Sequence, residues 1–357
     1  MPDGFDPATL AQSWPMPTAP RPIVTFGAGS IVGDAHFPAY RKAGFPIAGV
    51  YDPDIDKARK LGDAWGVTAF SSVEDAVAVQ GAVFDLATPP AVHAKALASL
   101  PDGAAVVIQK PMGADLGGAS EILRFCRTKR LTAAVNFQFR FAPMILALKD
   151  AIARGLLGEV VDFDVSLAVD TPWQLFSFLN GLPRIEIAMH SIHYLDLIRQ
   201  VLGDPLGVHA KTIGHPNHTM AQTRTSAILD YGTRVRCALS INHDHKFGRQ
   251  HQAAEFRVCG TDGAAYVRLG LILDYPRGEP DVLEIHAKGA NNWVSVPLNG
   301  SWFPDAFVGR MANLQRFAAG EDAELVSSVE DGWKTMALVE ALYQSSAAPA
   351  TPIPTAP

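Results

Sequence analysis

The feature that most constrains this chain is the rhythm of short apolar runs and helical patterns between Ile23 and Arg140. Five runs of four to six residues are almost unbroken in apolar character, which is typical of strands buried on both faces of a parallel sheet. Helical patterns separate them, so this segment is predicted to form βαβ units of a doubly wound parallel α/β sheet. The runs are Ile23–Phe26, Ile47–Tyr51, Ala82–Ala87, Ala104–Ile108 and Thr132–Val135.

After a predicted helix that follows Pro143, the pattern changes. Longer β-type runs are separated by turn residues such as Tyr231-Gly232 and Asp262-Gly263, which favours an antiparallel meander. Helices are expected at Glu186–Leu202, Asp305–Ala318 and Val329–Tyr343. The second half is therefore expected to be an α+β domain with an open, mostly antiparallel sheet. The runs are Val160–Val169, Val208–Thr212, Thr225–Leu229, Arg234–Ile241, Glu255–Cys259, Ala264–Leu269 and Val282–His286.

These patterns divide the 357 residues into four parts. Residues 1–22 contain six prolines and are predicted to be an extended arm. Residues 23–142 form the dinucleotide-type α/β domain with its Rossmann pattern, residues 143–346 the α+β domain, and residues 347–357 an Ala/Pro/Thr tail.

Composition excludes several classes of protein. The net charge of −6 and the lack of a Lys/Arg-rich run argue against a nucleic-acid partner. No apolar run is long enough to span a membrane, and the N-terminus lacks the pattern of a signal peptide, so a cytoplasmic protein is expected. Three scattered cysteines predict neither a disulfide framework nor a cysteine zinc site.

A glycine-rich loop follows the first predicted strand. Gly27 permits a tight turn and Gly29 a close approach to a pyrophosphate, with Ser30 and Ile31 as the next candidates in the loop before a helix expected after Gly33. Asp52 ends the second strand, where a carboxylate accepts hydrogen bonds from ribose hydroxyls and repels a 2′-phosphate. The loop therefore favours NAD over NADP. The alternatives are a simple tight turn with its third glycine, Gly33, out of register, and a solvated turn acid at Asp52.

Two later strand ends carry further candidates, because ligands of open α/β sheets bind beyond the carboxyl ends of the strands. Thr88 and Pro89 fall where a nicotinamide ribose is expected, although Thr88 also suits a helix cap. Lys110 ends a buried strand just before Pro111, where partial burial would lower its pKa and suit proton transfer. The alternative for Lys110 is an ordinary exposed lysine.

These motifs together resemble the glucose–fructose oxidoreductase / inositol dehydrogenase / MocA family over residues 22–346. The similar segments are Gly27–Ile31, Ala87–Pro90 with His93, Gln109–Pro111, Asn136–Pro143, Trp302–Phe307 and Ser328–Gly332. The resemblance implies an NAD(P)-dependent dehydrogenase of sugars, inositols or polyols with Lys110 as its catalytic lysine. It adds His93, Gln109, Lys110 and Gln138 to the cofactor-binding candidates. Gln109 stands where the family usually has glutamate.

A helix begins at Glu186, and Glu186, His190 and His193 follow the spacing of one helical face. The resemblance implies that Glu186 and His190 face the nicotinamide. His190 would then take the hydroxyl proton, Lys110 would bind the same oxygen and Glu186 would orient the pair. Two alternatives are a metal site completed by His243 and His245, which we do not adopt, and a polar helix face.

The substrate is expected to contact four further side chains near these elements: Arg140, Trp173, Arg184 and His193. The predicted function is NAD-dependent hydride transfer to and from a hydroxyl carbon of a sugar or polyol. One alternative is a redox-neutral enzyme that oxidises, eliminates a glycosidic group and reduces again; another is an NAD-binding regulator. The resemblance also implies a substrate-binding role for the α+β domain and a homodimer or homotetramer formed through its sheet.

Overall fold

Six parallel strands form the first sheet, in the order β3-β2-β1-β4-β5-β6. The computed structural model describes residues 6–217, 219–275 and 277–354. The five predicted strands are present with ends within one residue of those expected, and only the two-residue β3 was missed because it is too short to give a pattern. The strands are β1 Ile23–Phe26, β2 Ile47–Tyr51, β3 Thr68–Ala69, β4 Val83–Leu86, β5 Ala105–Ile108 and β6 Thr132–Val135.

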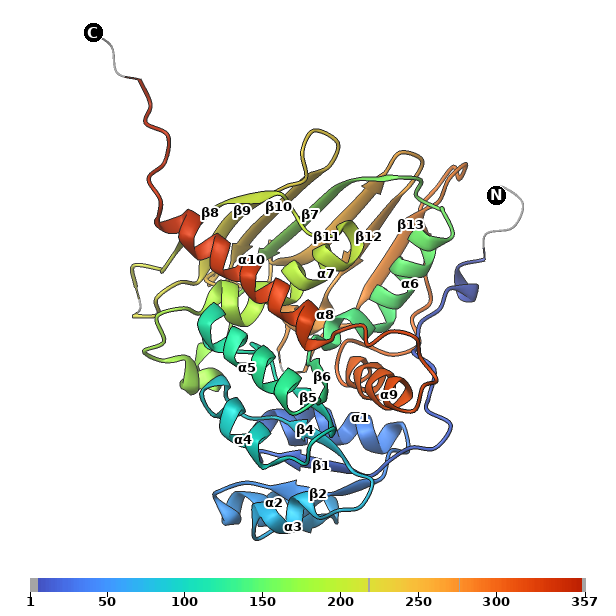
Figure 1. The fold of residues 1–357 in the computed structure, drawn as a ribbon. Helices are drawn as coiled ribbons and strands as arrows, with labels where there is room; N and C mark the ends of the chain where they lie inside the picture. The colour runs from blue at the N-terminus through green and yellow to red at the C-terminus, as the bar shows by residue number, and fades with distance from the viewer. Residues whose placement is uncertain (1–5, 218, 276, 355–357) are drawn as a thin grey trace.

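Helices cover both faces of this sheet, as the doubly wound prediction requires (Figure 1). Val106 and Ile108 of β5 pack in a cluster with residues of α4 and α5, whereas Ala105 and Val107 pack with residues of α1 and α9. The alternation explains why the strands are apolar throughout. These helices are α1 Phe37–Lys42, α2 Ile55–Trp65, α3 Val73–Val77, α4 His93–Ser99, α5 Leu116–Thr128 and α9 Ala306–Ala318.

A buried ionic network fastens α9 to this first sheet. Asp85 of β4 is 1% exposed and Arg310 of α9 is 2% exposed. A guanidinium nitrogen of Arg310 lies 3.4 Å from a carboxylate oxygen of Asp85. Tyr40 donates to Asp85 at 2.6 Å, and His36 Nδ1 lies 2.7 Å from the same carboxylate. Helix α9 lies in the last part of the chain, so the first sheet is completed by residues far from it in sequence.

The helix after the glycine loop begins earlier than the position after Gly33 that the sequence indicated. Helical structure starts at Ser30 and continues through a π-helical segment, Val32–His36, into α1. A π turn holds one more residue than an α turn. The π turn thereby accommodates the one additional residue that puts Gly33 out of register. Gly33 has no side chain, which leaves room for Leu61 of α2.

Eight strands form the second sheet, in the order β14-β13-β12-β11-β7-β10-β9-β8. All its pairings are antiparallel except that of β7 with β10, which confirms the mostly antiparallel prediction. The strands are β7 Val160–Ala168, β8 Gly207–Ile213, β9 Arg224–Asp230, β10 Arg236–Asn242, β11 Ala253–Gly260, β12 Ala264–Arg268, β13 Val282–His286 and β14 Val294–Ser295.

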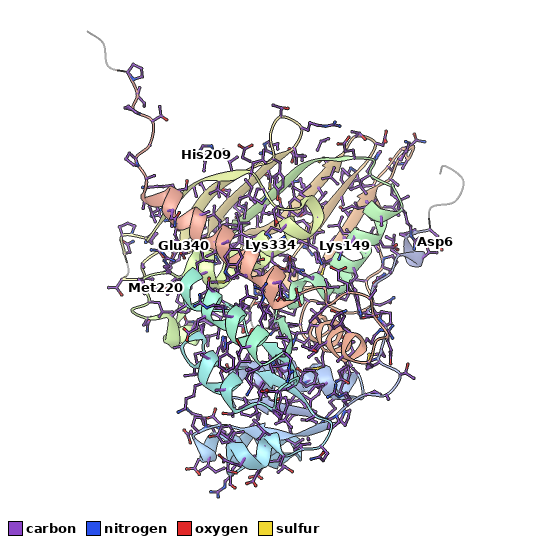
Figure 2. The ribbon with its side chains drawn as sticks, in the orientation of Figure 1. Asp6, Lys149, His209, Met220, Lys334 and Glu340 are labelled. Carbon is purple, nitrogen blue, oxygen red and sulfur yellow. The ribbon has the colours of Figure 1, made fainter. Side chains whose placement is uncertain are left out.

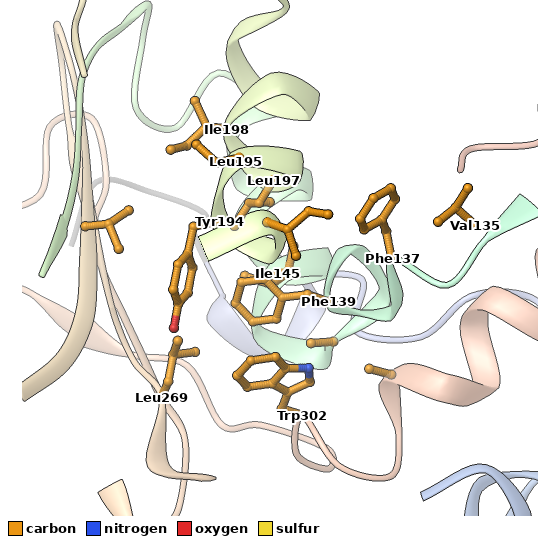
Figure 3. Packing of buried hydrophobic residues seen from close by; sticks show 14 of the residues in the cluster. Val135, Phe137, Phe139, Ile145, Tyr194, Leu195, Leu197, Ile198, Leu269 and Trp302 are labelled. Carbon is orange, nitrogen blue, oxygen red and sulfur yellow. The ribbon is translucent and has the colours of Figure 1, made fainter. Parts of the chain in front are cut away.

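Helices α6 Pro143–Ala153, α7 Ile192–Leu202 and α10 Val329–Ala347 lie on one face of this sheet (Figure 1). The short α8, Gly270–Leu273, follows β12 and was not predicted. Figure 3 shows the core beneath these helices, where the rings of Phe139 and Trp302 lie 4.4 Å apart. Tyr194 of α7 packs against Phe139 at 6.0 Å, joining the helix to this aromatic cluster.

The described part of the N-terminal arm runs along the surface of its own chain. Gln12 donates to the carbonyl of Pro297 at 2.8 Å, and Trp14 Nε1 donates to Asp322 at 2.8 Å. One short turn, Pro7–Thr9, interrupts the extended path that was predicted. At the other end, α10 continues to Ala347, and residues 348–354 contain no helix or strand. Residues 1–5 and 355–357 lie outside the described residues.

None of the helices in the described residues is both long and apolar enough to cross a membrane.

Candidate active site

The glycine loop joins β1 to the following helix at the centre of the first sheet. Gly27 has a φ of +101°, and a Cβ there would lie 2.5 Å from the carbonyl oxygen of Ala87. At Gly29 a Cβ would meet no atom within 4 Å, which leaves the loop open on its outer side. Ser30 is exposed and Ile31 half-buried at the start of the helix. Backbone N–H groups at such a helix start suit a pyrophosphate.

Asp52 supports this loop from the end of β2. Its carboxylate accepts the backbone N–H of Ala28 at 2.8 Å and that of Asp54 at 2.9 Å. The acid is therefore held beside the loop, where the remaining lone pairs of its oxygens can accept ribose hydroxyls. The glycine positions and this acid fit a dinucleotide.

The loop after β4 contains an exposed residue, Pro89, and leads to a fully buried residue, His93. Pro89 is exposed, and Thr88 Oγ1 is buried without a hydrogen-bond partner. His93, by contrast, is fully buried: its ring nitrogens lie 2.8 Å from the carbonyl of Thr88 and 3.1 Å from that of Met112. This histidine ties two loops together rather than presenting a free nitrogen to a nucleotide, because burial directed its ring into the protein.

Lys110 follows β5, as predicted, and its Nζ donates to the carbonyl of Met189 at 2.8 Å. Desolvation by the surrounding protein lowers the pKa of Lys110 to about 8. The side-chain oxygen of Gln109 accepts the backbone N–H of Lys110 and, at 3.0 Å, the amide of Asn136. Gln138 is buried nearby in the chain, and its Oε1 has no partner.

The segment that carries Met189 is a π-helical turn, Ile187–Ser191, which runs into α7. It changes the expected position of Glu186. The resemblance implied that it faces the nicotinamide together with His190, whereas this side chain is fully buried and accepts hydrogen bonds from Ser191 and Thr225. In a π turn the contact falls at i+5, which is the separation of Glu186 from Ser191.

His190 instead packs against His243 in a tilted arrangement, with ring centroids 4.6 Å apart and an interplanar angle of 51°. The ring of Trp173 lies 5.6 Å from each of these two histidines. Burial, and then the positive charge of Lys110, lower the pKa of His193 well below its ordinary value. Burial, His243 and Lys110 do the same to the pKa of His190. We call Lys110, Trp173, His190, His193 and His243 the nitrogen cluster.

His243 was considered in the sequence only as a metal ligand. It is 2% exposed; Nδ1 lies 2.7 Å from Thr171 Oγ1 and Nε2 lies 3.7 Å from Glu186. Glu186 therefore reaches His190 through His243. Only the pairing of β10 with β7 brings residues 171 and 243 together, and a single sequence carries no signal for that pairing. No group of three or more metal-ligating side chains occurs among the residues the structure describes.

Two predicted substrate residues lie elsewhere. Arg140 is 3% exposed and is held by Asp196 and Asp331, so it is a structural cation of the core. Arg184 pairs with Glu340 of α10, which Figure 2 labels, and its guanidinium lies 4.7 Å from the ring centroid of Tyr343. Among the described residues, no hydrogen bond or ion pair joins either arginine to the nitrogen cluster, since each pairs with carboxylates that are distant in sequence.

A dinucleotide-type sheet, joined to an open second sheet and with a lysine and histidines where the two meet, is the arrangement of a two-domain dehydrogenase. Residues 22–137 match the model of the oxidoreductase family with an NAD-binding Rossmann fold, and residues 145–266 match the GFO/IDH/MocA C-terminal domain. The chain belongs to the Gfo/Idh/MocA family of oxidoreductases.

Named relatives agree with this assignment. The chain is 24% identical over 322 residues to D-apiose dehydrogenase of Rhizobium rhizogenes, covering 85% of this chain and 89% of that protein. It is 26% identical over 200 residues to D-glucoside 3-dehydrogenase of Escherichia coli, covering 53% and 56%. An Agrobacterium radiobacter oxidoreductase, solved with NAD+, L-tartaric acid and magnesium, has a TM-score of 0.77 at 22% identity, covering 92% and 97%. The protein is an oxidoreductase with an NAD-binding fold.

Proposed function

We propose that this protein transfers a hydride between a hydroxyl carbon of a sugar or polyol and NAD. The observation that carries the proposal is the nitrogen cluster, which holds Lys110 close enough to His190 and His193 for its charge to add to the effect of burial and lower the pKa of both histidines. Relatives named as dehydrogenases of D-apiose and D-glucosides support a substrate of this kind.

Residues 23–142 would hold the cofactor. Gly27, Gly29, Ser30 and Ile31 would receive the pyrophosphate and Asp52 the adenosine ribose; Thr88, Pro89, Gln109 and Gln138 line the loops on the nicotinamide side. The bound cofactor would supply the hydride acceptor. Asp52 favours NAD, because a carboxylate at this place repels the 2′-phosphate of NADP.

The chain's own groups would handle the proton. His190 is neutral near pH 7 because its pKa is lowered, so its ring nitrogen is free to accept the hydroxyl proton. Lys110, held by the Met189 carbonyl, would donate a hydrogen bond to the same substrate oxygen. Glu186 would act through His243, by holding that ring against His190.

The test is absorbance at 340 nm with NAD or NADP and a panel of aldoses, inositols, uronates, aldonates and glycosides. We expect a rise with NAD, and a loss of two orders of magnitude or more in Lys110→Ala, whereas the exposed Lys95→Ala should behave like the wild type. Full turnover in Lys110→Ala would refute the assignment of this lysine. A flat trace from protein that binds NAD would favour the redox-neutral reaction, detected as aglycone released from a glycoside, or a regulator if nothing is released.

We also propose a homodimer or homotetramer formed through the second sheet. One face of this sheet carries no helix (Figure 1), and Ile228, on that sheet's β9, is 55% exposed. Light scattering after gel filtration should give a mass of two or four chains, and Ile228→Lys should shift it towards one. The cytoplasmic location stays a prediction.

A further inference from the structure

The nitrogen cluster contains buried nitrogen atoms without partners and one ammonium group, Lys110, that forms no ion pair with a carboxylate of the described residues. We infer that the substrate of this enzyme is anionic: a sugar or polyol that carries a carboxylate, such as an aldonate or a uronate. This inference rests on the proposed function and names the substrate class of the same site.

The first observation is the set of buried nitrogens without partners. His190 Nε2, His193 Nδ1 and Trp173 Nε1 are all buried and have no hydrogen-bond partner in the structure. A buried polar group left unpaired costs about 1–3 kcal/mol, so a ligand that supplies oxygen atoms here is favoured. The indole nitrogen can only donate, so at least this position requires an acceptor from the ligand.

The second observation is the unused capacity of Lys110. Its ammonium group has three N–H bonds, of which one is directed at the carbonyl of Met189. Within the described residues, no Asp or Glu side chain forms an ion pair with Lys110, His190 or His193. The ammonium group of Lys110 therefore has no carboxylate partner among the described residues, because Glu186 contacts the cluster at His243, 3.7 Å away.

The acidic and amide groups closest to the cluster in the chain are already committed. Both carboxylate oxygens of Glu186 accept hydroxyl hydrogens, from Ser191 and Thr225. Asp244, next to His243, accepts from Thr223. Gln109, next to Lys110, is neutral, and its oxygen is taken by the backbone of Lys110 and by Asn136.

These facts favour a carboxylate over a neutral hydroxyl group. A charge-assisted hydrogen bond from an ammonium group to a carboxylate is roughly twice as strong as a neutral one. An unpaired buried charge is unfavourable, and a negative ligand removes that penalty whereas a neutral sugar does not. A site for neutral polyols would gain from carboxylates that accept hydrogen bonds from the substrate hydroxyl groups. Among the described residues, no carboxylate forms an ion pair with Lys110 or His190 and so lies beside them for this purpose.

The experiment compares matched pairs that differ in one carboxylate. Initial rates with NAD+ are measured at 340 nm for D-gluconate against D-glucitol and for D-glucuronate against D-glucose. We expect kcat/KM to be higher by about tenfold or more for the acid of the preferred pair, the factor given by one hydrogen bond to a charged group. His193→Glu should cancel or reverse this preference, while His193→Gln, which adds no charge, should keep it.

Binding to the NADH-loaded protein, measured by calorimetry, separates this inference from the proposed function. If the neutral substrates are oxidised with the same kcat/KM as the corresponding acids, the inference is wrong and the proposed function stands. If nothing is oxidised but gluconate binds at least tenfold more tightly than glucitol, the inference stands and the proposed reaction fails. If nothing is oxidised and the acid binds no better than the neutral compound, the inference is refuted as well.

Discussion

Replacing Asp85 by asparagine should destabilise the protein strongly, because it removes the counter-charge of a buried arginine. Arg310 is 2% exposed, and Asp85 is its carboxylate partner. Breaking a buried pair on one side costs about 3–5 kcal/mol, most of it from the charge left alone. Tyr40 and His36 also lose the carboxylate that both contact, because asparagine keeps only one acceptor oxygen.

The expected change in melting temperature follows from the size of the chain. With an unfolding entropy of about 2.1 cal/mol/K per residue, a loss of 3–5 kcal/mol lowers the Tm of 357 residues by about 4–7 °C. Differential scanning calorimetry or circular dichroism at pH 7 measures this. The control is Asp102→Asn, whose exposed carboxylate pairs with the half-buried Lys129 and the exposed Arg130; its loss should cost about 1 kcal/mol or less.

A double variant tests the cause. Asp85→Leu combined with Arg310→Met removes both charges and keeps apolar volume, so it should be markedly less destabilising than Asp85→Asn. If Asp85→Asn costs no more than Asp102→Asn, or if the double variant is the least stable of all, uncompensated charge is not the reason.

The remaining predictions concern the glycine loop, the proposed catalytic lysine and the stability of the protein at low pH. Gly27→Ala should lower both stability and NAD affinity, because a Cβ would lie 2.5 Å from a carbonyl oxygen, whereas Gly29→Ala should leave the Tm unchanged and weaken only NAD binding; calorimetry and thermal melts distinguish them. The rate of oxidation should fall as pH rises through about 8, where Lys110 loses its proton, and a pH profile that climbs steadily to pH 10 would contradict a charged donor. Burial lowers the pKa of His36 in the folded protein, and Arg310 and His36 hold the pKa of Asp85 well below its usual range despite burial. The unfolded chain therefore binds protons at a higher pH than the folded protein at both groups. The Tm should fall as pH drops below about 6.5 through His36 and fall further below about 4 through Asp85, and only this second fall should be missing in Asp85→Asn.

The sequence predicted the elements whose burial leaves a local pattern. β5 was visible because it is apolar on both faces, and Lys110 because it stands directly after that run. The orientation of Glu186 was not predictable from i, i+4 spacing, since the π turn shifts its contact to Ser191.

The remaining differences between the sequence expectations and the structure come from contacts between segments far apart in the chain. Arg140 was expected at the substrate, but its partner Asp331 lies 191 residues further along, so its burial has no local signal. His243 entered the site for the same reason, through the pairing of β7 with β10. Local sequence patterns therefore predicted the strands and helices, whereas contacts between distant segments determine which polar residues line the site.

The return of α9 to the first sheet affects how the chain is made. Arg310 must reach Asp85 across 225 residues, and the backbone N–H of Val135 donates to the carbonyl of Ser327 at the edge of β6. While the chain leaves the ribosome, the part of one apolar face that α9 covers would therefore stay exposed until residues 306–328 have been synthesised. Such an exposed face is a target for chaperones during translation, and a truncation before α9 would leave it uncovered permanently.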